Sequence, residues 1–406
     1  MYLKNRAYLK NKVIFIFFII TIFNIPFILL KNYAYSLENI KYDIYQINNT
    51  KIYYIKSNNE MLSSFSIINK IGAYYDELSG QAHLCEHIFF KNKYNNNYIK
   101  YILSNNGAKY NAATFNDFII FYLTSNNQYI LKNIDIFLYS FFYPSFDQND
   151  VNTEKNVVIT ELNTGYQDEN IYKIFSKYYK PTGGIVNDIK KIDYNILYNY
   201  WKKNYTTDNM TIIIYSYLPF NYFNSSFIKY FNKDPKYLTT QEIKFKNFEQ
   251  IESNLNSYYN NFIDFINKNL KDFETIETKD YIYFYIESKD NIIYYDLLSE
   301  IINQKLKDFN NNNKNNLELY SIFIPTKLSN FFIIKVKKNN TKDKNFYKNY
   351  ILNIINNISY QDFKNSYLES YIDYLNFFSS NFEFIQFFSF LIGLNLLDII
   401  QNFLNL

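Results

Sequence analysis

The chain has 406 residues, of which 48% are hydrophobic, and it contains only 7 Gly and 6 Pro, so collagen-like and Pro/Gly-rich low-complexity classes are excluded. The formal net charge is +4, and residues 1–34 hold five basic residues and no acidic one, so the rest of the chain carries 4 − 5 = −1. A body this close to neutral lacks the basic surface typical of nucleic-acid binders, and we expect no nucleic-acid partner. The single cysteine, Cys85, excludes an intramolecular disulfide.

The amino terminus has the pattern of an export signal. Four basic residues precede an apolar run at 13–30, and small residues around Ser36 suit cleavage after that position. Eighteen helical residues would span about 27 Å, so an uncleaved membrane anchor through 13–30 is the alternative. We therefore expect residues 1–36 to be a signal peptide or a membrane anchor, on a protein that is exported, periplasmic or secreted, or else anchored.

The first half of the body mixes strands and helices without strict alternation. The apolar segments KIYYI and SSFSIINKI, between Tyr45 and Lys70, predict an antiparallel hairpin. Further strands are predicted near 116–124 and at 210–216. Helical patterns lie between these strands, at 83–105, 127–141, 149–163 and 189–203.

The second half repeats this order of elements in weaker form. Strands at 281–287 and 331–337 bracket a helix near 293–307, which is followed by a polar loop at 310–316. The segment 218–248, with two prolines and several lysines, is predicted to be a linker. The expected fold is α+β, with two pseudo-repeated domains at 37–217 and 249–406. Each is a mostly antiparallel sheet with helices layered on it, and the second is degenerate and shortened at its C-terminus.

The two histidines of the chain stand four residues apart, in the sequence Q-A-H-L-C-E-H. Ser79 and Gly80 offer an N-cap just upstream, and on the helix that follows His83 and His87 lie one turn apart on one face, with Glu86 beside them. Two imidazoles at this spacing can bind one zinc ion while the adjacent carboxylate reaches a metal-bound water. This order, H-x-x-E-H, is the inverted zinc-peptidase motif.

A catalytic zinc needs a third protein ligand. The segment E-K-N-V-V-I-T-E places Glu154 and Glu161 seven residues apart, on one stripe of a predicted helix. We expect Glu161 to be the third ligand. Glu154 is not expected to bind the metal, but to form hydrogen bonds that help to orient the metal-bound water or one of the metal ligands. Cys85 lies between the two histidines but off the metal-facing side of their helix, and we expect it to be a small core residue.

At this point the sequence resembles the pitrilysin family of zinc peptidases, which includes insulin-degrading enzyme and the mitochondrial processing peptidases. The segment 71–92 resembles the family's strand end, its Glu at Glu77 and its metal-binding helix. The resemblance covers about residues 45–217 and continues in N-A-A-T (111–114), Y-K-P-T-G-G-I (179–185) and Y-T-T-D-N-M-T-I-I-I (205–214).

The resemblance implies an exported zinc-dependent endopeptidase with one zinc ion per chain. Glu86 would act as general base on zinc-bound water, with Glu154 assisting the site. An extended peptide or unfolded protein would add as a strand to the sheet edge at Asn111 and Ala112. From its residue type alone, Asn111 could equally close a turn after Gly107.

In the second half, the family's C-terminal domain carries an Arg and, seven residues on, a Tyr that grip the substrate. Tyr320 stands where that Tyr could fall, but Asn313 stands in place of the Arg, and no arginine follows Arg6. We therefore expect a second family subunit, or a second copy of the chain, to complete the grip. The alternative function is a non-catalytic or weakly active subunit that binds peptides or supports a partner.

Overall fold

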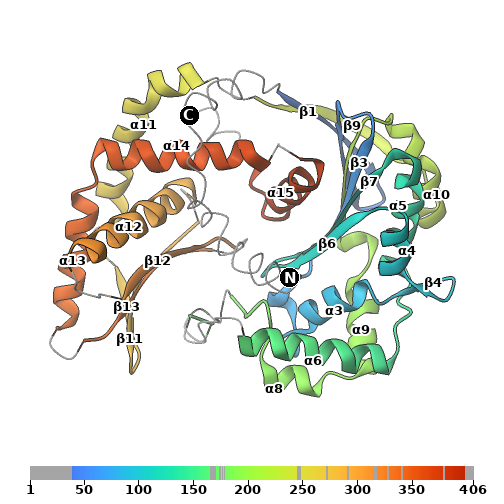
Figure 1. Ribbon diagram of the computed structural model, residues 1–406, viewed down its shortest axis with the longest axis horizontal. Helices are drawn as coiled ribbons and strands as arrows, with labels where there is room; N and C mark the ends of the chain where they lie inside the picture. The colour runs from blue at the N-terminus through green and yellow to red at the C-terminus, as the bar shows by residue number, and fades with distance from the viewer. Residues whose placement is uncertain are drawn as a thin grey trace. The chain divides into compact units, whose positions relative to one another are not determined.

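The protein is described here by a computed structural model that forms two compact units (Figure 1). The described residues are 39–164, 171–172, 175, 177, 179–244, 248–270, 273–289, 292–313, 318–326, 329–339, 342–377 and 380–397. The predicted signal or anchor at 1–36 lies outside them. Among the described residues, no helix combines the length and the apolar character needed to cross a bilayer.

The first unit comprises residues 39–244 together with 377–397 and is built on a seven-stranded sheet in the order β6-β7-β3-β8-β2-β1-β9. All neighbouring strands are antiparallel except β2 and β8, which run parallel. The strands are β1 (Ile40–Ile47), β2 (Thr50–Lys56), β3 (Leu62–Asn69), β6 (Lys109–Thr114), β7 (Ile119–Asn126), β8 (Met210–Ser216) and β9 (Lys236–Ile243).

The predicted hairpin between the two apolar segments of 45–70 is wrong in its pairing. The segments do form β2 and β3, but β8 lies between them in the sheet, pairing with β2 on one side and β3 on the other. The hairpin partner of β2 is β1, which is joined to it through Asn48 in the left-handed conformation (φ 51°). An apolar strand such as β8 is buried best in the middle of a sheet, and this tertiary preference overrides the local pairing.

Helices cover both faces of this sheet. Figure 1 shows α4, α5 and α10 on one side and α15 on the other. The helices of the first unit are α3 (Gln81–Phe89), α4 (Ile99–Asn105), α5 (Asn127–Phe142), α6 (Gln148–Thr164), α8 (Val186–Lys191), α9 (Tyr194–Asn204), α10 (Asn224–Phe231) and α15 (Asn381–Gly393), with short 3-10 turns η2 (Ala73–Tyr75), η3 (Thr207–Asn209) and η4 (Phe220–Phe223).

The helix predicted at 83–105 is interrupted. A two-stranded ribbon, β4 (Lys93–Tyr94) and β5 (Asn97–Tyr98), separates α3 from α4. Its turn consists of Asn95 and Asn96, both with positive φ (50° and 62°), a conformation that asparagine tolerates and that matches the twist of a two-residue hairpin. Because asparagine is common throughout the chain, Asn95 and Asn96 did not stand out as a turn signal within the helical pattern.

The segment 218–248 is not a linker in the structure. It holds η4 and α10, and β9 within it pairs along β1 and forms one edge of the large sheet. The strand is mostly exposed and polar, which is why its sequence reads as a connection rather than as a strand.

The second unit comprises the described residues between 248 and 376 and holds a four-stranded antiparallel sheet in the order β10-β11-β13-β12. Its helix α12 runs through Asn313, so the first four residues of the predicted polar loop at 310–316 are helical. Its strands are β10 (Glu274–Glu277), β11 (Tyr281–Ser288), β12 (Leu319–Ile324) and β13 (Asn330–Lys337), and its helices are α11 (Phe248–Asn269), α12 (Ile292–Asn313), α13 (Lys344–Asn356) and α14 (Tyr360–Phe377).

The expected fold class is confirmed, since each unit is an α+β domain built on a mostly antiparallel sheet. The division of the chain differs from the expected one at its C-terminal end. Helix α15, expected in a domain at 249–406, packs on β3, β7 and β8 and belongs to the first unit. Its apolar residues bury against the face of the large sheet that the other helices leave uncovered, a contact that the local sequence does not reveal.

Candidate metal centre

Helix α3, which carries the H-x-x-E-H motif, is held by its apolar side. The side chains on this side of the helix are fully buried in the hydrophobic core of the first unit, and they include Leu84, Cys85, Ile88 and Phe89. The ring of Phe89 stacks on Phe121 of β7 with centroids 4.1 Å apart. Cys85 is a buried core residue, as predicted. This packing fixes the rotation of the helix, so the motif side chains face α6.

Three side chains from α3 and α6 bring metal-ligating atoms together: those of His83, His87 and Glu161. The two Nε2 atoms are 3.2 Å apart, and Oε2 of Glu161 lies 3.8 Å from Nε2 of His83 and 3.6 Å from Nε2 of His87. The side chains of the histidines are almost fully buried, whereas that of Glu161 is 22% exposed. The three predicted ligands therefore meet at one point.

The other nitrogen of each histidine is engaged by a hydrogen bond. Nδ1 of His87 donates to Oε2 of Glu154 at 3.0 Å, and Nδ1 of His83 donates to the backbone carbonyl of Gly183 at 3.2 Å. Because a carboxylate and a carbonyl can only accept here, these partners place the ring protons on Nδ1. Both Nε2 lone pairs are then directed at the shared point.

The negative charge of Glu154 is balanced by Lys91 and by the hydrogen bond from His87. Its Oε1 pairs with Nζ of Lys91 at 3.0 Å, while Oε2 takes the His87 proton. Burial raises the pKa of Glu154, but its hydrogen bonds to His87 and Lys91 outweigh burial and hold the pKa below its usual value. Burial lowers the pKa of His87, and the bonds to Glu154 and Glu161, with the charge of Glu86, outweigh it and raise the pKa.

This donor set fits a divalent metal ion. Two imidazoles and one carboxylate are the ligands of many catalytic zinc sites, and bonds of about 2.0–2.1 Å at tetrahedral angles put neighbouring ligand atoms about 3.3 Å apart. The observed separations of 3.2, 3.6 and 3.8 Å are close to that spacing. Two Nε2 lone pairs at 3.2 Å repel each other unless a cation or a proton lies between them. The site can therefore hold a metal ion.

The amino-terminal end of α3 is capped by a residue that the sequence analysis missed. Gly80 is the N-cap, with φ 107°, but no side chain of Ser79 or Gly80 caps the helix. Instead the carboxylate of Asp76 accepts hydrogen bonds from the backbone amides of Gly80 (2.8 Å) and Ala82 (3.0 Å) and from the hydroxyl of Tyr200 (3.0 Å). An acidic residue four positions before the N-cap glycine was the signal available in the sequence.

Asp76, not its neighbour Glu77, is the buried acid of this segment. Glu77 is exposed and pairs with Lys203 at 2.7 Å. Burial raises the pKa of Asp76 to about 7, against the opposing hydrogen bonds from Gly80, Ala82 and Tyr200. The backbone carbonyl of Asp76 also accepts a hydrogen bond of 2.8 Å from Nζ of Lys180. Lys180 stands just before the loop that contains Gly183.

Glu86 faces the edge strand. Its Oε2 accepts a hydrogen bond of 2.7 Å from the hydroxyl of Thr114, the last residue of β6, which forms one edge of the large sheet. Asn111 and Ala112 lie in the middle of this strand, so Asn111 does not close a turn. The Asn111 amide donates to the hydroxyl of Tyr122, at 3.4 Å, and the Ala112 side chain is buried.

The remaining predicted site residue lies in the other unit. Tyr320 is in β12 and pairs in register with Lys335 of β13, whose Nζ lies 5.6 Å from the centroid of the Tyr320 ring. Lys335 lies 15 residues after Tyr320 in the sequence, so the expected Arg-to-Tyr spacing of seven residues gave no sign of it. Asn313 is the last residue of α12.

Comparison with known proteins agrees with the fold and the motif. Residues 51–178 match the family described as Insulinase (Peptidase family M16). Over 171 residues the chain is 25% identical to the mitochondrial-processing peptidase subunit beta of Neurospora crassa, a match that covers 39% of this chain and 36% of that protein. The matched part is thus about a third of the relative's length.

The similar solved structures cover most of the chain. A protease from Helicobacter pylori has a TM-score of 0.67 at 13% identity, covering 91% of this chain and 93% of that one. A peptidase M16 inactive domain from Pseudomonas fluorescens has a TM-score of 0.61 at 14% identity, covering 90% of each. At such identities the likeness concerns the fold alone. The match over residues 51–178 and the similarity to the Neurospora crassa subunit confirm the resemblance to the insulinase (pitrilysin) family of peptidases that the motifs predicted.

Proposed function

We propose that this protein is a zinc-dependent endopeptidase that cleaves extended peptides. One observation carries the proposal: the converging ligand atoms of His83, His87 and Glu161, with Glu86 beside them and hydrogen-bonded to the edge strand through Thr114. A site assembled for another purpose would not need a carboxylate held between a metal-ligand helix and an open strand edge.

His83, His87 and Glu161 would hold one zinc ion per chain. When bound, zinc would supply a Lewis acid that polarises the scissile carbonyl and lowers the pKa of water. Glu154 fixes the orientation of His87 and Gly183 that of His83, which keeps both Nε2 atoms directed at the ion. Two neutral imidazoles and one carboxylate leave the site with a net charge of +1, which favours an electron-rich carbonyl.

The substrate would bind as an additional strand along β6. The Asn111–Ala112 part of β6 would offer backbone amide and carbonyl groups on the open edge of the strand, because among the described residues β6 pairs with β7 and with no strand on its other side. Glu86 would take a proton from the attacking water and pass it to the leaving amine. The hydroxyl of Thr114 would hold the Glu86 carboxylate in position for both transfers.

A partner and a location belong to the same proposal. We propose that the protein is exported through its amino-terminal segment and acts with a second family subunit or a second copy of the chain. The absence of any arginine after Arg6 supports a need for a partner that completes the grip around Tyr320. The Neurospora crassa relative is itself named as a subunit.

The central test is peptide cleavage by the purified chain with and without a metal chelator. The chelator should abolish cleavage and zinc should restore it. Glu86→Gln keeps the shape of the side chain but removes the proton acceptor, so bound zinc should remain while kcat falls by roughly 10²- to 10⁴-fold. Glu60→Gln, a change at an exposed glutamate, is the matched control and should leave kcat unchanged.

The alternative, a non-catalytic subunit, makes a different prediction. It would bind zinc and peptides but show no cleavage alone, at any concentration, or in complex with its co-purified partner. If instead the isolated chain is fully active and Tyr320→Phe does not change its KM, no partner is needed and the second unit has no part in the grip.

A further inference from the structure

Helix α15 lies against the sheet face opposite α3 and reaches the edge strand. Its amino-terminal residue is fixed by two hydrogen bonds to β3: the Asn381 amide donates to the carbonyl of Leu62, and the hydroxyl of Ser64 donates to the carbonyl of Asn381, each at 3.1 Å. Further along, the hydroxyl of Ser389 donates to that of Ser66 at 2.8 Å. The position of the helix on the sheet is therefore well determined by contacts within the first unit.

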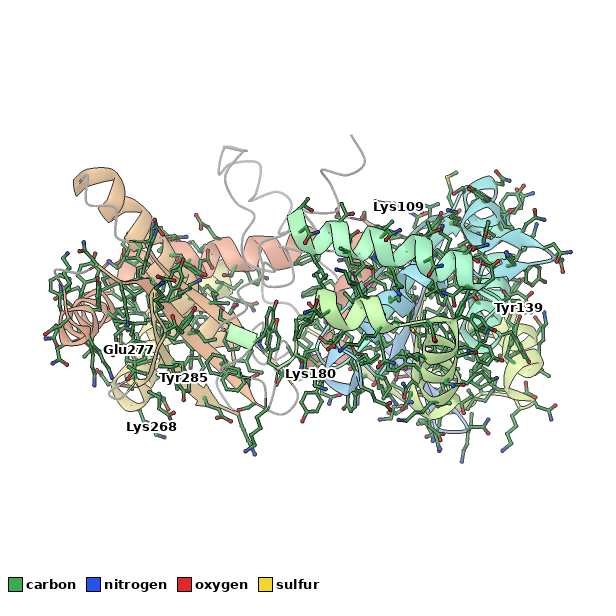
Figure 2. The ribbon with its side chains drawn as sticks, turned by 90° about the horizontal axis from the view of Figure 1, so that it is seen from below. Lys109, Tyr139, Lys180, Lys268, Glu277 and Tyr285 are labelled. Carbon is green, nitrogen blue, oxygen red and sulfur yellow. The ribbon has the colours of Figure 1, made fainter. Side chains whose placement is uncertain are left out.

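Phe382, in the first turn of α15, lies beside the edge strand. Its ring centroid is 4.9 Å from that of Tyr122, whose register partner in β6 is Asn111. The ammonium of Lys109, the first residue of β6, lies 4.0 Å from the centroid of the Phe382 ring. Figure 2 labels Lys109 on this unit.

Residues of β6 alternate between two environments. Ala112 is part of the core beneath α3 and Thr114 reaches Glu86, so the even positions face the metal side. Lys109 and Asn111 therefore face the α15 side. A peptide strand added to β6 would alternate in the same way and would direct every second side chain toward the face that carries Lys109 and Phe382.

The charge of Lys109 is available to a ligand. The side chain is exposed, and among the described residues the ammonium forms no ion pair with a carboxylate. The Phe382 ring holds the ammonium from one side, which positions the cation without neutralising it. Because Lys109 already covers the face of the Phe382 ring, a further ligand would bind to the ammonium, and that ligand should be an anion.

From this geometry we propose a distal subsite that selects an acidic substrate side chain, formed by Lys109 and Phe382. Lys109 is five residues from Thr114 along β6, about 17 Å at 3.4 Å per residue. The preferred carboxylate of an extended peptide thus lies about five residues from the bond that is cleaved. The predicted distance of five residues rests on the proposed binding of the peptide along β6. The subsite itself can be detected by peptide binding, without cleavage.

The test measures peptide binding separately from turnover. Fluorescently labelled eleven-residue peptides, neutral except for a single Glu moved through each position, are titrated by anisotropy against the zinc-loaded Glu86→Gln variant. One position should bind about two- to five-fold more tightly with Glu than with Gln, the range of an exposed ion pair, and the preference should shrink at high salt. With cleavage by the unaltered chain as a second readout, that position should lie about five residues from the cleaved bond.

Variants then assign the preference to this corner. Lys109→Glu should reverse it, so that Lys at the same position binds more tightly than Glu, and Phe382→Leu should weaken it. Lys51→Glu, an exposed change on β2 with the same effect on net charge, is the control and should leave the preference intact. Equal binding of all peptides, or the same response to Lys51→Glu, would overturn the subsite. Selective binding without any cleavage would keep the subsite and refute the peptidase proposal.

Discussion

Gly184 lies directly against Gly80: a Cβ added to Gly184 would stand 2.5 Å from the Cα of Gly80, and both residues have positive φ, 89° and 107°. This contact joins the loop after Pro181 to the start of the metal-site helix. It places the carbonyl of Gly183 at 3.2 Å from Nδ1 of His83. The close approach of two backbones is thus part of the geometry of the candidate metal centre.

Gly184→Ala should therefore weaken metal binding. The added methyl group must push the loop away from α3, which removes the acceptor that fixes the His83 ring, and the loss of such a partner typically costs 10- to 100-fold in metal affinity. Zinc affinity is measured by competition with a chromogenic chelator. Gly107→Ala is the matched control, because Gly107 also has positive φ (68°) but nothing lies within 4 Å of its added Cβ. Equal losses for both variants would show that backbone strain alone explains the effect.

The two glutamates of α6 should separate in their effects on zinc. Glu161→Gln removes a ligand, so stoichiometric zinc should be lost, as it should in the double variant of His83→Ala and His87→Ala. Glu154→Gln removes the negative charge of the acceptor that orients His87 and should lower zinc affinity by about 10- to 100-fold while one ion per chain can still bind. Zinc content after dialysis distinguishes the two.

The outcome that would contradict this assignment is complete zinc loss in Glu154→Gln with retention in Glu161→Gln. Lys91→Met provides a further check. It removes the cation that neutralises the other oxygen of Glu154 while leaving every ligand in place, so its effect on zinc affinity should be smaller than that of either glutamate change.

The sequence was sufficient for many of the elements and for the ligands, but not for the long-range arrangement of the strands. Period-2 and period-3.6 patterns predicted β8 at its observed bounds, Met210–Ser216, and α5 within one residue of its observed end. The H-x-x-E-H spacing predicted the two histidine ligands, because one helical turn sets their geometry locally, and the spacing of the two glutamates in the later helix pointed to Glu161 as the third. Strand order was not predictable in the same way, since the insertion of β8 between β2 and β3 depends on burial of the whole sheet.

Two contacts around the metal centre were not predicted from the sequence. The acceptor for His83 is a backbone carbonyl, which every residue carries, and only the fold selects that of Gly183. The cap of α3 was predicted at Ser79 and Gly80, whereas the carboxylate of Asp76 accepts the hydrogen bonds there, and its burial depends on the neighbouring helix that carries Tyr200.

Asp76 should give the first unit a distinctive pH dependence. Its pKa is about 7 in the folded protein because of burial, against about 3.9 for an unfolded aspartate. Between about pH 4 and pH 7 the folded chain holds a proton that the unfolded chain has released. The contribution of this group to stability is therefore largest at the acidic end and falls as the pH rises through this window.

Asp76→Asn removes this titration. The unfolding free energy of the variant relative to that of the unaltered protein should rise from pH 5 to pH 8. The measurement is urea unfolding in the presence of a chelator, followed by the fluorescence of Trp201, the one tryptophan of the chain, which is buried in the first unit. Glu77→Gln, at the exposed neighbour, is the control. A difference between variant and unaltered protein that does not change with pH would show that Asp76 is ionised throughout the range.

The last prediction concerns α15, which completes the first unit although more than 130 residues separate it from the last strand of that unit's sheet. Phe388 is 1% exposed, and its ring meets that of Tyr42 edge to face at 5.8 Å. Phe388→Ala should therefore lower the unfolding free energy of the first unit, measured by the fluorescence of Trp201, by about 3–5 kcal/mol, the usual cost of removing a buried phenylalanine. Phe363→Ala removes an equally buried ring from the second unit and should leave that transition in place. If the two variants shift the Trp201 transition equally, the units unfold together and α15 has no special part in the first; if only Phe363→Ala shifts it, the assignment of α15 to the first unit is wrong.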